Sequence, residues 1–288
     1  MSSKYYYLIA GLAEISLDDD RLPYSVDTFR EEIFPSLSAS DRRLVGLALE
    51  QYDRRNLLTL LEKAKGGEDL QPDDTAVTGS LTFEQLVGVI EAVRAGESAD
   101  NAVPEYISRF TKEYLDDEWQ SHSAFAEDRL SSLFYEYAST IGNGFVRDWF
   151  SFNLDLNNIQ TALTARKHSL PVQNLIVGDG EVAEALRTSG AKDWGLSQTV
   201  GFFDRLVRIQ DEADLTLRER EIDMIKWNWM EENTFFHYFT VEKLFAFLVR
   251  LDIAGRWLKL DKEKGQEMFR SLIASLKSGV EVPAEFAE

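Results

Sequence analysis

The chain has 288 residues, of which 44% are hydrophobic, 28% charged and 12% aromatic, a composition typical of a folded globular protein. It contains no cysteine, which excludes disulfides, thiolate metal sites and thiol nucleophiles. Thirty-one basic residues against fifty acidic ones give a net charge of −19, so phosphate backbones and anionic lipid repel the chain. We therefore expect no nucleic-acid partner. The acidity is either a solvated surface or, in part, a face for a basic protein partner.

Apolar segments are too short for a membrane span. The first, residues 5–12, ends before Glu14 and the acidic residues 18–20, and no later stretch reaches the roughly 18 apolar residues that a spanning helix needs. No cleavable targeting segment is visible either. We expect a cytoplasmic protein without direct membrane insertion.

Apolar residues recur every three or four positions along most of the chain, and this spacing predicts an all-α fold. The clearest helix begins after Thr82, whose side chain can cap it together with Gln85 three residues later. Short extended pieces are possible at residues 5–12 and 172–177. The predicted helices cover residues 41–65, 80–94, 124–140, 199–215, 217–232 and 240–260.

Polar, glycine-containing breaks at residues 96–104 and 188–195 divide the chain into near-equal thirds. Near-equal thirds suggest an internal repeat. We predict three related helical repeat domains at residues 1–100, 101–195 and 196–288, of which the third has diverged most.

A repeated segment supports this division. Residues 53–65 and 155–167 align without a gap at an offset of 102 (155 − 53), and five of thirteen positions are identical. A third copy at residues 252–264 keeps three of these positions and has Gly255 where the others have asparagine. The repeated residues are Asp53, Asn56, Thr59, Leu61 and Lys65, then Asp155, Asn158, Thr161, Leu163 and Lys167, then Asp252, Leu260 and Lys264.

The polar members of the repeat suit a structural joint. On a helix, Asp53 and Asn56 share one face because they are three residues apart. An asparagine amide at the start of an apolar run can bond a free backbone group of a neighbouring segment. A direct contact between these residues and a partner is the alternative.

The run 152–167, with Asp155, Asn158, Ile159, Leu163 and its closing basic pair, resembles a signature of the C/d subunits of V-type and A-type rotary ATPases. Residues 52–57 resemble a first copy of the same element, and the aromatic-rich opening at residues 5–12 is similar to the start of those subunits. The chain also looks like a divergent bacterial branch associated with V-type ATPase gene clusters.

This resemblance implies a funnel of three helical domains that caps the membrane rotor ring and seats the central axle. The partners would be the axle subunits and the ring, so the protein would lie at the membrane only through them, with no small-molecule substrate and no catalysis of its own. A helical scaffold or adaptor of another complex is the alternative function, and an enzyme of unrecognised type is the third.

Catalytic and cofactor motifs are missing from the sequence. The histidines at positions 122, 168 and 237 are too widely spaced for a metal-binding motif, and no phosphate-binding loop or serine-hydrolase elbow occurs. We therefore predict no catalytic, cofactor-binding or metal-ligating residues and no cofactor.

Overall fold

The computed structural model describes residues 5–73, 76–100, 102–116 and 126–279, with side chains as far as Glu263. Every regular element in these ranges is a helix, which confirms the predicted all-α class. The elements before the second repeat segment are α1 (Tyr6–Ala10), α2 (Val26–Ile33), η1 (Phe34–Ser36), α3 (Ala39–Gly46), η2 (Leu47–Leu49), α4 (Glu50–Gly66), α5 (Phe83–Ala95), α6 (Glu105–Leu115) and α7 (Ala126–Ser139). The elements that follow are α8 (Gly144–Lys167), η4 (Val172–Asn174), α9 (Glu181–Thr188), α10 (Phe203–Gln210), α11 (Leu215–Asn233) and α12 (Val241–Gly279).

Both expected extended pieces are wrong. Residues 5–12 contain helix α1, in which the amide of Ile9 donates to the carbonyl of Tyr5 at 3.0 Å. Residues 172–177 begin with the single 3₁₀ turn η4. Their alternation of apolar residues was weak, and neither segment lies beside a strand in the described part of the chain, so local helical bonds satisfy the backbone instead.

Caps explain where the helices begin. The predicted capping box of α5 is confirmed, since the Gln85 amide donates to Thr82 Oγ1 at 3.3 Å and the Thr82 amide donates to Gln85 Oε1 at 2.9 Å. The helix expected over 199–215 is shorter, because α10 covers only Phe203–Gln210. The next helix, expected from residue 217, begins at Leu215 because Asp214 caps it. The helix expected over 41–65 is interrupted by η2.

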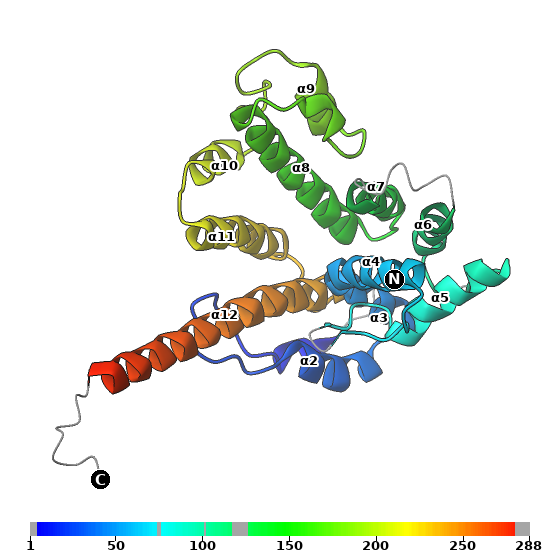
Figure 1. Ribbon diagram of the computed structural model, residues 1–288, viewed down its shortest axis with the longest axis horizontal. Coiled ribbons are helices and arrows are strands. Elements are labelled where there is room, and N and C mark those ends of the chain that lie inside the picture. Colours follow the sequence, from blue (N-terminus) through cyan, green and yellow to red (C-terminus); the bar gives the residue numbers. More distant parts are fainter. Residues whose placement is uncertain (1–4, 74–75, 101, 117–125, 280–288) are drawn as a thin grey trace, which may run out of the picture.

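The helices follow a recurring order. Helix α4 packs against α5 and α6, which follow it in the sequence, and α8 packs in the same way against α9 and α10. Helix α12 packs against α2, α3, α8 and α11, so the C-terminal part of the chain rests on the N-terminal part (Figure 1). The last turns of α12 extend away from the other helices (Figure 1).

The expected domain boundaries lie in loops, but helices pack across them. Residue 100 lies between α5 and α6, which contact each other, and residue 195 lies between α9 and α10, both of which pack on α8. The buried apolar residues form one connected cluster that runs from Ile15 to Trp257. The funnel of three domains stays a prediction.

Aromatic rings join α8, α11 and α12 at the centre of this core. The ring of Trp229 lies 5.3 Å from those of Trp149 and Phe152, and Phe150 meets Phe245 edge to face at 6.3 Å. Such pairs add about 0.5–1.5 kcal/mol each beyond the burial of their surface. The aromatic residues of α8 that precede the second repeat segment therefore hold this helix against α11 and α12.

Candidate functional site

The first repeat segment forms a buried joint between α4 and the loop that leads to α5. Asp53 is 1% exposed, and its carboxylate accepts hydrogen bonds from the amide of Ser80 at 3.1 Å, the amide of Leu81 at 2.9 Å and the Ser80 hydroxyl. One turn later, Nδ2 of Asn56 donates to the carbonyl of Val77 at 2.9 Å. The two polar side chains thus fix one loop against one face of α4.

A glycine makes this close approach possible. A Cβ atom added to Gly79 would lie 2.7 Å from both Cγ and the backbone nitrogen of Asp53. Real Cβ atoms do not come this close to other atoms, so only glycine allows the loop to pass this near to α4. Nothing in the local sequence pattern singles out Gly79.

The second repeat segment repeats the asparagine joint. Asn158 is 3% exposed, its Nδ2 donates to the carbonyl of Val177 at 2.8 Å, and its Oδ1 accepts from the Val177 amide at 3.0 Å. Val177 lies in the loop that leads from α8 to α9, which corresponds to the position of Val77 between α4 and α5. A valine about twenty residues after each asparagine is the sequence signal that could have identified these loops.

The two aspartates differ in their partners. Asp155 is half-buried, has no hydrogen bond within the described residues, and faces the negative charge of Glu181 at the start of α9. Burial and this charge raise the pKa of Asp155 to about 6. Burial also raises the pKa of Asp53 to about 7, because desolvation outweighs the hydrogen bonds from Ser80 and Leu81.

In the third segment the aspartate connects distant helices. Asp252 on α12 accepts hydrogen bonds from the Tyr52 hydroxyl at 2.8 Å and from Nε2 of Gln51 at 2.9 Å, both on α4. Burial raises the pKa of Asp252 as well. Gly255, which replaces the asparagine, has no side-chain amide, so this segment forms no asparagine joint.

A second carboxylate stands beside Asp252. Asp223 on α11 is 1% exposed and accepts from Nε1 of Trp257 at 2.8 Å and from the Arg256 guanidinium. Lys226, one turn further along α11, has its pKa lowered by burial. Asp223, Lys226, Asp252 and Arg256 line a cavity of about 110 Å³ that also touches α4 and α8.

This polar cluster is built to connect helices. Pockets that take organic ligands measure roughly 300–1,000 Å³, several times the volume of this cavity. Asp223 and Asp252 each accept hydrogen bonds from another part of the chain, and Glu50 accepts from Arg54 at 2.8 Å. The arrangement fixes α4, α11 and α12 relative to one another.

The remaining repeat residues occupy mixed environments. Leu61 is fully buried, Leu163 is half-buried and Leu260 is 38% exposed, so the apolar position weakens from the first copy to the third. Thr59 and Thr161 are both half-buried, and Lys65 and Lys167 are both exposed, with the Lys65 ammonium 4.2 Å from the ring centre of Tyr114. The side chain of Lys264 lies outside the described residues.

The described ranges hold no group of three or more histidine, aspartate or glutamate side chains placed to bind a metal ion. His122 lies outside those ranges, His168 follows α8 and His237 lies 3.7 Å from Glu242. None of the helices that the structure describes combines the length and the apolar character needed to cross a membrane.

The chain belongs to the family described as "Protein of unknown function (DUF2764)", whose model matches residues 1–280. No curated protein matches the sequence. The family match covers all of the repeat segments and both asparagine joints.

Replacing either joint asparagine with leucine is expected to lower stability, because the loop carbonyl loses the donor that the buried side chain supplied. Asn158→Leu should reduce the free energy of unfolding by about 1–3 kcal/mol, and by more than Asn56→Leu, since Asn158 makes two bonds to Val177 and Asn56 makes one to Val77. Denaturant unfolding measures both, with Ser151→Leu, an exposed position on the α8 helix, as the control. Unchanged midpoints in both variants would contradict the joint.

Gly79→Ala is expected to destabilise the protein by about 1–3 kcal/mol, because the added methyl group collides with Asp53. Gly88→Ala is the matched control. Gly88 is exposed inside α5 with no atom near its added Cβ, so alanine there should stabilise by about 0.5–1 kcal/mol. Thermal melts that moved in the same direction for both variants would exclude the close approach.

The raised pKa of Asp155 predicts a pH-dependent effect of Asp155→Asn. The folded protein holds this proton more tightly than the unfolded chain, so wild-type stability falls as pH rises from about 4 to about 6. Asparagine does not titrate. The variant should therefore gain stability relative to wild type across this window and keep the gain at pH 7. Urea unfolding at several pH values measures the difference, which Asp148→Asn, exposed on the same helix, should not show.

Proposed function

We propose that the chain is a non-catalytic central-stalk subunit of a V/A-type rotary ATPase that couples the axle to the membrane rotor ring. The observation that carries the proposal is the repeated joint, in which Asn56 and Asn158 hold the carbonyls of Val77 and Val177 in corresponding loops. The resemblance to the C/d subunits rests on these same segments. The resemblance implies an all-helical chain of three related domains, and the all-α fold and the repeated joint support that interpretation.

A surface for a protein partner supports this role. Exposed aromatic side chains gather where α1 meets the turn between α11 and α12, since the Tyr6 ring lies 4.8 Å from Phe239 and the Tyr5 amide donates to the Phe239 carbonyl at 2.8 Å. Exposed apolar patches mark interaction surfaces, and aromatic residues are enriched in them. We define this aromatic patch by the exposed residues Tyr6, Tyr7, Phe235, Phe236, Tyr238 and Phe239.

Rigid connections between distant helices suit a part that transmits torque. Asp252 bonds to Gln51 and Tyr52, some 200 residues earlier in the chain, at distances of 2.9 and 2.8 Å. A net charge of −19 would add an attraction to basic loops of the ring or axle.

Affinity purification of the tagged protein from the cells that produce it, in gentle detergent with mass spectrometry, tests the proposal. We expect the stalk and rotor subunits of the ATPase at near-stoichiometric amounts. The double variant Tyr7→Ala, Phe236→Ala should reduce their recovery at least about tenfold, because truncation of an aromatic at an interface hot spot costs about 2 kcal/mol or more.

The double variant Leu170→Ala, Leu215→Ala, which removes exposed leucines outside the aromatic patch, is the control and should leave recovery unchanged. Recovery of a different assembly would replace the proposal with an adaptor function, and a protein without partners would overturn it.

A further inference from the structure

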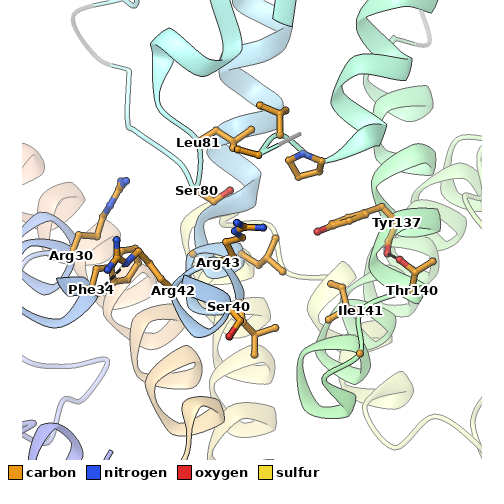
Figure 2. A pocket seen from close by; sticks show the side chains of 17 residues that line it. Arg30, Phe34, Ser40, Arg42, Arg43, Ser80, Leu81, Tyr137, Thr140 and Ile141 are labelled. Carbon is orange, nitrogen blue, oxygen red and sulfur yellow. Dashed lines mark hydrogen bonds between the residues drawn. The ribbon is translucent and has the colours of Figure 1, made fainter. Parts of the chain in front are cut away.

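A second site lies in a cavity of about 520 Å³ between two groups of helices. One side is formed by α2, α3 and the loop before α5, and the other by the loop before α6 and the C-terminal end of α7 (Figure 2). The volume is within the range of small-molecule sites. It does not include the polar cluster, the aromatic patch or the repeated asparagines.

The charge of this cavity is opposite to that of the protein. Arg30, Arg42 and Arg43 line it, and no aspartate or glutamate is found among its lining residues in the described part of the chain. Another cavity, between α10 and α11, also has arginines in its lining, but there Glu212 and Glu221 offset part of their charge. The cavity therefore offers three positive charges that its own lining leaves without an anionic partner.

The arginines keep hydrogen-bond donors for a ligand. Arg30 uses Nη1 on the carbonyl of Thr78 and Arg42 uses Nε on the carbonyl of Phe34, each at 3.0 Å, so both forks retain further N–H groups. Within the described residues, the Arg43 guanidinium and the Tyr137 hydroxyl make no hydrogen bond. Figure 2 shows Arg43 between Ser80 and Tyr137, with Arg30 and Arg42 beside Phe34.

Apolar side chains complete the walls. Leu44, Leu81, Val103, Pro104 and Ile141 line the same cavity, and Phe34 lies under the Arg30 guanidinium at 5.9 Å. A ligand that fits must therefore combine several negative charges with an apolar or aromatic body.

We propose that this cavity binds an organic polyphosphate of the nucleoside di- or triphosphate class. Guanidinium groups recognise phosphate through paired hydrogen bonds, and three of them match the charge of a polyphosphate, whereas a single carboxylate would neutralise only one. The apolar walls accommodate the body of the ligand. A ligand in the cavity contacts both the α2–α3 side and α7, whether or not the chain is a stalk subunit.

Thermal unfolding of the full chain with ADP, pyrophosphate or citrate, without divalent cations and at matched ionic strength, tests the proposal. A ligand that binds only the folded state raises the midpoint. We expect ADP to raise it most, pyrophosphate less because it lacks the organic body, and citrate least. The rise should shrink as salt is added, because the charges are then screened.

Titration calorimetry with ADP identifies the residues. Arg43→Gln should weaken binding at least about tenfold, because it removes charged hydrogen bonds. Arg208→Gln, an exposed arginine of the other cavity, is the matched control and should change binding less than about twofold. Comparable midpoints of the unliganded variants exclude a folding defect.

Equal effects of ADP and citrate, or equal binding by wild type and Arg43→Gln, would overturn the proposal. Binding of an oligoglutamate peptide without binding of ADP would also overturn it and would indicate an acidic protein segment as the occupant. The partner purification described above does not depend on this cavity, so either proposal can fail while the other stands.

Discussion

A buried side-chain amide must find hydrogen-bond partners, and in two places this chain uses a buried asparagine on a long helix to hold the backbone of a neighbouring loop. Asn56 and Asn158 fix the loops that carry Val77 and Val177, and these loops set the start of α5 and α9. Because α5 and α6 pack on α4 as α9 and α10 pack on α8, the placement of each group of helices depends on its joint.

The C-terminal helices are held by charge as well as by packing. Asp252 and Asp223 are buried and accept hydrogen bonds from α4 and from α12 respectively, beside the aromatic contacts of Trp229. Removing one partner of such a buried group costs more than the bond itself contributes, because the remaining group is left desolvated. These contacts therefore favour one relative position of α4, α11 and α12, which is the property that a torque-transmitting subunit would need.

Two surfaces of the molecule differ in the chemistry that they offer. The aromatic patch is apolar and exposed at the turn between α11 and α12, as suits a protein partner. The cavity lined by Arg30, Arg42 and Arg43 is concave and positive in a chain of net charge −19. Since these surfaces lie on different elements, a partner and a small anion could be bound at the same time.

The sequence by itself determined the all-α class, the capping box of α5 and the correspondence of Asn56 with Asn158, because periodicity, caps and repeats are local patterns. It could not give the boundary at Asp214 or the absence of strands at residues 5–12, where local signals were weak.

Only the tertiary structure decided that Asn56 binds Val77, that Gly79 must be glycine, and that Asp252 binds Tyr52. It alone also brought Arg30, Arg43 and Tyr137 to one cavity. These contacts join residues about 20 to 200 positions apart, and no local pattern specifies which distant segment satisfies a buried polar group.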